Sequence, residues 1–224
     1  TYALLKVKGR TDADLDWLER SFNKLLVNFT WWVNRKDRTG KNAFEGGFLG
    51  LDNIGVFDRS APLPTGGSLE QADGTAWMAF YCQNMLEMAL ILAEHDPQYE
   101  EDAFKFVQHF IWIAYAMDRI GEHQDEMWDE TDGFFYDVLR LPDGWATRLK
   151  TRSMVGLLPL CAATVFDSRM LMQRPDVYER LRAFTAERPE LRALIHDPAL
   201  VGHSGRRLAA VLSETRLRRV LAAM

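Results

Sequence analysis

Apolar residues recur with the helical period of about 3.6 positions in three long stretches of the chain. These stretches cover residues 15–33, 77–92 and 104–120. Pro97 follows the second stretch and Gly121 follows the third, and both residue types commonly mark the end of a helix. The pattern therefore predicts three long helices of about twenty residues each, with one face buried.

Helical periodicity also occurs over shorter spans, in residues 155–166, 176–186 and 208–224. Strand-like signals are nearly absent. The exception is residues 134–139, an aromatic and aliphatic run between two Asp-Gly turn signals, which we expect to form a short β ribbon. For the whole chain the pattern predicts one all-α domain in which long helices alternate with long loops.

Two segments lack any regular period, residues 35–68 and 121–150. Both are longer than the roughly 12–15 residues above which structureless connections become uncommon in compact domains. An antiparallel helix pair separates them, so both segments should emerge at the same end of the helices. We therefore expect a functional site between them.

The first of these segments contains a glycine-rich stretch, residues 44–60, whose apolar side chains argue against disorder. Together with the start of the next helix it supplies five carboxylates: Glu45, Asp52, Asp58, Glu70 and Asp73. A desolvated carboxylate keeps its proton to higher pH and can donate it to a leaving group. Each also has a structural alternative: Asp58 can pair with Arg59, Glu70 suits the first turn of a helix, and Asp73 suits a helix cap.

Composition narrows the classes of function. The chain has 224 residues, is 47% hydrophobic and has a formal net charge of −5. It can therefore build a core without disulfides, and it has no basic field for nucleic acid and no apolar run long enough for a membrane span. Cys82 and Cys161 both fall in apolar helical patterns. We expect buried free thiols and a reducing, cytoplasmic location.

Motifs for metals and cofactors are not found. The acidic runs near residues 52–58 and 125–132 do not fit EF-hand spacing, and the five histidines do not have zinc-site spacing. The phosphate-binding, dinucleotide-binding and GxSxG motifs are also missing from the sequence. We therefore expect no metal and no cofactor, and we interpret His109, on an apolar helix, as a core residue.

Four segments of the sequence resemble bacterial members of glycoside hydrolase family 63: residues 28–37, 44–60, 69–78 and 152–160. The most specific part is the tetrapeptide Gly50-Leu51-Asp52-Asn53. The resemblance implies part of an (α/α)6 barrel of the six-hairpin glycosidase type, with long loops at one end. It also implies an inverting glycosidase for α-linked glucosides or glycosylglycerates, in which one carboxylate protonates the glycosidic oxygen and another activates water.

Carried over by position, Asp52 matches the general acid of that family. Phe48 and the neighbouring Asp58 and Arg59 would shape and polarise its pocket. Asp73 resembles the acidic residue that holds sugar hydroxyls. Two further candidates for carbohydrate binding are Trp77, whose ring can stack on a sugar face, and Arg152, in a later loop that approaches the same pocket.

The general-base glutamate of the family has no match in this sequence. In complete enzymes it lies in a tryptophan-rich motif nearer the C-terminus. We therefore interpret residues 1–224 as a partial catalytic domain truncated before that region, which should bind sugar weakly and be inactive alone. Helices that do not close a barrel would expose apolar stripes, and self-association would cover them.

Two alternatives stay open. The first is a non-catalytic carbohydrate-binding or scaffold domain with the same helical toroid. The second is another toroid enzyme, such as a sugar epimerase or a polysaccharide lyase, for which His109 and Tyr136 are candidate bases.

Overall fold

The computed structural model describes residues 12–37, 40–45, 50–118, 126–167, 174–187 and 201–224. Its α-helices are α2 (Asp12–Lys36), α3 (Ala72–Leu92), α4 (Tyr99–Asp118), α6 (Pro175–Ala186) and α8 (Glu214–Ala222), and its 3₁₀ helices are η1 (Met154–Cys161) and η2 (His203–Gly205). The strands are β1 (Ser68–Glu70), β2 (Trp128–Asp129), β3 (Phe134–Phe135), β4 (Asp137–Arg140), β5 (Ala146–Leu149), β6 (Ala163–Asp167) and β7 (Arg206–Ala210).

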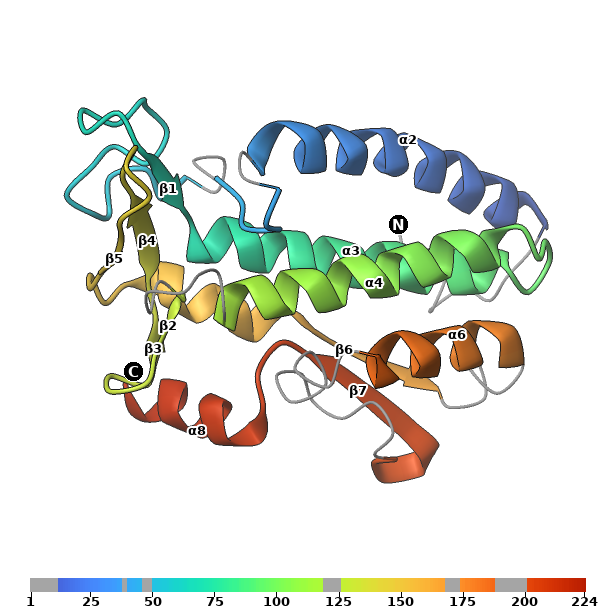
Figure 1. Cartoon of the computed structure of the whole chain (residues 1–224). Coiled ribbons are helices and arrows are strands. Elements are labelled where there is room, and N and C mark those ends of the chain that lie inside the picture. The colour runs from blue at the N-terminus through green and yellow to red at the C-terminus, as the bar shows by residue number, and fades with distance from the viewer. Residues whose placement is uncertain (1–11, 38–39, 46–49, 119–125, 168–173, 188–200) are drawn as a thin grey trace.

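The three long helices build the core. α3 and α4 form an antiparallel pair, and α2 lies along this pair (Figure 1). Phe22 and Phe29 of α2 pack edge-on against Phe106 of α4, with ring centroids 6.1 and 5.1 Å apart. α3 is buried on nearly every side, because α2, α4, η1 and β6 all pack against it. A helix with neighbours all round is expected to be apolar all round, as α3 is.

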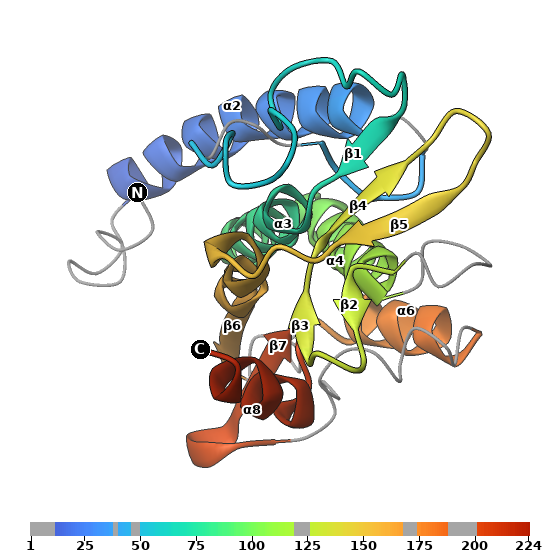
Figure 2. The ribbon, with the colours of Figure 1, turned by 90° about the vertical axis from the view of Figure 1, so that its left-hand side faces the viewer.

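Three small antiparallel sheets accompany the helices, with strand orders β1-β4-β5, β2-β3 and β6-β7. In the largest sheet, Leu139 of the central strand β4 lies opposite Leu69 of β1 and Thr147 of β5. This sheet lies at the end of the helix pair where α3 begins (Figure 2). Next to it, η1 packs closely on β3, since a Cβ atom at Gly156 would lie 2.3 Å from both Phe134 Cε1 and Phe135 O.

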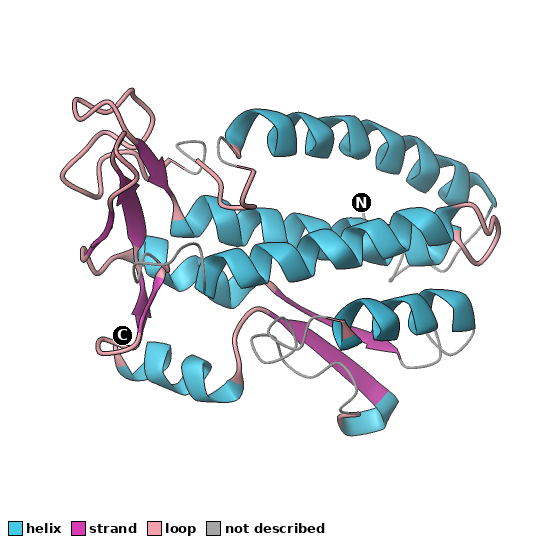
Figure 3. Ribbon diagram, in the orientation of Figure 1, coloured by secondary structure: helices cyan, strands magenta, loops and turns pink. Residues whose placement is uncertain are grey.

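The expected all-α fold class is wrong, and with it the expected part of an (α/α)6 barrel. Helices and strands are mixed along the chain, as Figure 3 shows. Residues 155–166, expected to be helical, form most of η1 and then β6, and Pro159 lies inside η1. Residues 208–224 begin with the end of β7 and continue into α8. The strands are too short to show a clear alternation, and β6 pairs with a strand about forty residues away.

The main local predictions are confirmed. The three long helices are present, although residues 119 and 120 of the third lie outside the described residues. The expected ribbon at residues 134–139 corresponds to β3 and β4, which belong to two different sheets. Among the helices of the described part, none is long and apolar enough to cross a membrane.

Candidate functional site

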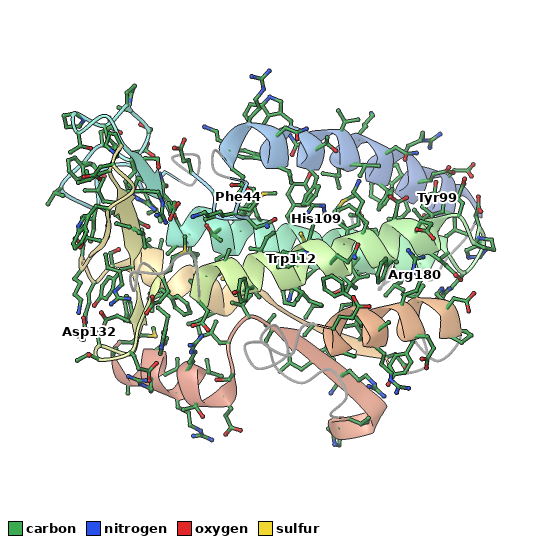
Figure 4. All side chains as sticks on the ribbon, in the orientation of Figure 1. Phe44, Tyr99, His109, Trp112, Asp132 and Arg180 are labelled. Atoms are coloured by element: carbon green, nitrogen blue, oxygen red, sulfur yellow. The ribbon has the colours of Figure 1, made fainter. Side chains whose placement is uncertain are left out.

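The glycine-rich segment reaches the start of α3, and two contacts fix its first part there. The backbone N–H of the buried Phe44 donates to Thr75 Oγ1 at 3.0 Å, and the carbonyl of Phe44 accepts from the N–H of Gln71 at 3.0 Å. Figure 4 labels Phe44 at this end of α3. Phe48 lies outside the described residues. The chain is described again from Gly50, whose φ of 72° is in the left-handed region that favours glycine.

Arg59 anchors the second part of this segment. Its Nε donates to Asp137 Oδ2 at 2.7 Å, Nη1 donates to Asp73 Oδ2 at 3.0 Å and to the carbonyl of Leu51 at 2.9 Å, and Nη2 donates to Asp73 Oδ1 and, at 3.2 Å, to Asp137 Oδ1. A guanidinium has five N–H donors, so all of them are used. Arg59 therefore fixes the loop and has no N–H left for a ligand.

The two carboxylates that bind Arg59 lie beside the first turn of α3. Asp73 is 1% exposed and also accepts from the N–H of Gly74, while Asp137 accepts from the N–H of Ala72. Burial raises the pKa of Asp137, although Arg59 and the N–H of Ala72 act in the opposite direction. Because the N-terminus of a helix favours negative charge, α3 helps to hold both carboxylates. We call Arg59, Asp73 and Asp137 the buried ion cluster.

Asp52 lies on the wall of a cavity of about 450 Å³, lined by Gly50, Asp52, Asn53, Gly55, Val56, Phe57 and Asp58. Asp52 as a whole is half-buried, but its Oδ1 atom is buried and has no hydrogen-bond partner among the described residues. The backbone on both sides is held by Arg59, whose N–H donates to the carbonyl of Asp52 at 2.9 Å and whose Nη1 binds the carbonyl of Leu51. The cavity wall thus contains a half-buried carboxylate on a fixed backbone, and one of its two oxygens is buried and unsatisfied.

Asp58 does not bond with Arg59 in the described part of the chain. It is exposed, and its Oδ1 accepts from the N–H of Ser60 at 2.9 Å and from Ser60 Oγ at 2.6 Å. These hydrogen bonds lower the pKa of Asp58. The ionised form of Asp58 is therefore stabilised by hydrogen bonds within its own turn.

Trp77 and Arg152 do not line the Asp52 cavity. Trp77 is exposed on α3 and contacts the ring of Phe80 at 5.8 Å. Arg152 is exposed, and its Nε lies 3.3 Å from the hydroxyl of Tyr136. A part for either residue in carbohydrate binding stays a prediction.

The two long loops lie at the same end of the helices, as expected, but the Asp52 cavity is lined by residues of the first loop only. β1 pairs with β4, and Arg59 of the first loop binds Asp137 of the second. A small cavity of about 20 Å³ lies between them, lined by residues of both loops, among them Phe57, Arg59, Asp137 and Leu149. The sequence analysis did not identify Asp137 as a site residue. The one hint in the sequence was that a single carboxylate interrupts the apolar run 134–139.

The two candidate bases of the epimerase or lyase alternative are not at the Asp52 cavity. His109 contacts the ring of Phe29 edge-on at 5.3 Å, between α2 and α4. Tyr136 donates to Asp132 at 3.0 Å. The acidic turn at residues 129–132 is engaged by basic side chains, since Lys150 binds Asp129 at 2.7 Å and Asp132 at 3.2 Å. Among the described residues no group of three His, Cys, Asp or Glu is arranged to hold a metal.

Both cysteines in the described part of the chain are free. Cys82 is buried on α3, and burial raises its pKa well above the ordinary value. Cys161, at the end of η1, is exposed, so the expectation of a buried thiol is wrong there. The apolar run that suggested burial is a 3₁₀ helix, and its last residue faces solvent.

Comparison with known proteins finds a relative in yeast. The chain is 51% identical over 189 residues to "Uncharacterized protein YMR196W" of Saccharomyces cerevisiae. The match covers 80% of this chain and 17% of the yeast protein, so the chain spans less than a fifth of the length of that relative. No family model matches the chain. The likeness to the yeast protein names no activity, and the function of the whole protein is a matter for proposal.

Proposed function

We propose that this chain carries the proton-donor part of an inverting glycoside hydrolase similar to family 63, which acts on α-linked glucosides or glycosylglycerates. Asp52 is the general acid in this proposal. One observation carries it: Asp52 lines a cavity of about 450 Å³ and has a buried carboxylate oxygen without a hydrogen-bond partner among the described residues. Because the side chain is only half-buried, the carboxyl in its protonated form can reach into the cavity and donate to the glycosidic oxygen of a bound sugar.

The anchoring of the loop supports this role. A general acid must lie within hydrogen-bond reach of the oxygen that it protonates, so its backbone has to be fixed. Arg59 binds the carbonyls of Leu51 and Asp52, and it is itself held by Asp73 and Asp137. In this scheme Arg59 and Asp73 position the acid, and Phe57, on the cavity wall, offers a ring to the sugar.

Inversion requires a second carboxylate about 6.5–9.5 Å from the acid, with water between them. Asp58 lines the same cavity, but it is bonded to Ser60. The resemblance to family 63 places the base in a tryptophan-rich segment that has no match in these residues. We therefore propose that another part of the complete protein supplies the base, and that these residues alone bind sugar without turning it over.

The test is Asp52→Asn in the complete protein. Loss of the general acid should lower kcat/KM for α-linked glucose disaccharides and for glucosylglycerate by about 10²- to 10⁴-fold. An aryl α-glucoside with a good leaving group should lose much less, because its departure needs little protonation. Steady-state kinetics on both substrate types measures this difference. The matched control is Asp96→Asn, in the turn between α3 and α4 at the opposite end of the helix pair.

Three results would decide between the proposals. Equal turnover of natural substrate by the wild type and Asp52→Asn would remove Asp52 from the mechanism. Proton NMR of the freshly formed product shows which anomer is released. Release of the α-anomer would contradict inversion. Sugar binding by the complete protein without turnover of either substrate type would favour the carbohydrate-binding alternative.

A further inference from the structure

We propose that a second pocket, separate from the Asp52 cavity, binds a neutral polyhydroxylated ligand such as a single sugar ring or a polyol. The pocket has a volume of about 270 Å³ and is lined by Lys36, Glu45, Arg59, Ser60, Ala61, Pro62, Leu63, Gly66, Gly67, Ser68, Leu69 and Gln71. None of these residues lines the Asp52 cavity. The proposal does not depend on the proposed glycosidase function.

Gln71 is the residue that points to a ligand. Its side chain is 1% exposed, and its Nε2 donates to the carbonyl of Arg59 at 2.8 Å. Its Oε1 atom is buried and finds no hydrogen-bond partner in the described part of the chain. The contact with a carbonyl fixes which end of the amide carries the N–H groups, so the free atom is an acceptor. A buried acceptor without a donor costs about 1–3 kcal/mol, and a ligand hydroxyl would remove this penalty.

The rest of the lining selects the chemistry of the ligand. Lys36 and Glu45 contribute opposite charges, and the guanidinium of Arg59 is paired with Asp73 and Asp137 and has no free N–H, so Arg59 offers no hydrogen bond to an anion in the pocket. Pro62 and Leu63 provide an apolar wall beside the polar groups. A sugar ring or a polyol has both hydroxyl donors and an apolar C–H face, and it fits this combination.

The wall of the pocket is fixed by close packing. The N–H of Glu45 donates to the carbonyl of Lys36 at 2.9 Å, which joins the end of α2 to the start of the glycine-rich segment. A Cβ atom at Gly67 would lie 1.9 Å from the carbonyl oxygen of Arg140, so the chain runs against β4 at a distance that only glycine allows. At about 270 Å³ the pocket lies near the lower limit of about 300 Å³ for ligand sites, which suits one sugar ring.

The test is titration of the isotopically labelled protein with glucose and with glycerol, followed by NMR. Binding should give saturable shifts of the Gln71 side-chain amide and of the backbone amides of residues 60–69 other than Pro62 and Pro64. Ala61→Trp, which fills the pocket from its exposed rim and removes no side-chain hydrogen bond, should abolish these shifts. Gln71→Leu should weaken binding about tenfold or more, since it removes the acceptor.

The matched control is Gln83→Leu. Like Gln71, Gln83 is 1% exposed, and its Nε2 donates to a backbone carbonyl, that of Ala209. Its Oε1 is likewise buried without a partner among the described residues. Gln83 differs from Gln71 in that it does not line this pocket. Gln83→Leu should give the same saturable shifts of the Gln71 side-chain amide and of the pocket backbone as the wild type does. Either of two outcomes would overturn the proposal: no saturable shift with either probe, or undiminished shifts in Ala61→Trp. Saturable binding of inorganic phosphate in the same pocket, without sugar or glycerol binding, would also overturn it.

Discussion

At the scale of single residues, the buried ion cluster dominates the energetics of the candidate site. It contains one guanidinium and two carboxylates, and the side chains of Arg59 and Asp73 are 2% and 1% exposed. Removing charges from water is expensive, and the cost is recovered only when every lone pair and N–H is well paired. Here the geometry meets that condition for Arg59, whose five donors all have acceptors. The cluster therefore depends on all three of its members.

The first prediction is that Arg59→Met lowers the free energy of unfolding by about 3–5 kcal/mol, because it leaves two carboxylates buried without their cation. Methionine is similar in length and apolar, so the change removes charge more than volume. Urea unfolding followed by circular dichroism measures the loss. Arg218→Met is the control, since the pair of Arg218 with Glu214 on α8 is largely exposed. An equal stability of the two variants would contradict the assigned importance of the cluster.

His109 allows a prediction about pH. It lies between α2 and α4, where Figure 4 labels it, and burial, with a smaller contribution from Lys105, lowers its pKa from the ordinary value of 6.5. The unfolded chain takes up a proton near pH 6.5, but the folded chain does so only at lower pH. The stability that neutral His109 contributes is therefore fully present above pH 6.5 and is lost as the pH falls toward the lowered pKa.

His109→Phe keeps a ring against Phe29 and removes the titrating group. We expect its free energy of unfolding to fall less between pH 7 and pH 5 than that of the wild type, as measured by urea unfolding at a series of pH values. Parallel curves for the wild type and His109→Phe would show that His109 does not couple folding to protonation.

At the scale of elements, the sequence predicted what local periodicity determines. α2, α3 and α4 have long apolar stripes, so their existence and extent follow from the sequence. The three sheets could not be predicted in the same way. β1 has three residues and β2 has two, and their pairing depends on partners that are distant along the chain.

The same reasoning explains which parts of the site were found. Asp52 and Asp58 lie in one glycine-rich segment, and a sequence motif can show residues that are close along the chain. Asp137 reaches the site only because β4 pairs with β1, and Gln71 matters only because its amide is buried beside Arg59. These are consequences of three-dimensional packing, and neither residue has a local sequence signature. Phe48 lies outside the described residues, so its expected role stays a prediction.

At the scale of the whole molecule, α8 joins segments that are far apart along the chain. Arg216 binds Asp118 at the end of α4, and Arg219 binds Glu130 in the turn between β2 and β3. Between them lies the buried ring of Trp128, with the guanidinium carbons of Arg216 and Arg219 at 4.9 and 5.3 Å from its centroid. Figure 1 shows α8 beside this hairpin, at the end of the molecule where the two loops meet.

The last prediction is that the double variant Arg216→Met, Arg219→Met loosens this end of the molecule without unfolding the core. The charged hydrogen bond of Arg216 is partly buried and should contribute about 1.5–3 kcal/mol, so its loss should speed local opening about tenfold or more. Hydrogen exchange followed by mass spectrometry should then show faster exchange in α8 and in β2–β3, with unchanged exchange in α3. Arg182→Met and Glu179→Gln, at an exposed pair on α6, provide the control. If α8 opens independently, the exchange rates in α3 stay unchanged. Faster exchange to the same degree in α3 and α8 would therefore contradict the prediction and show that α8 unfolds only together with the core.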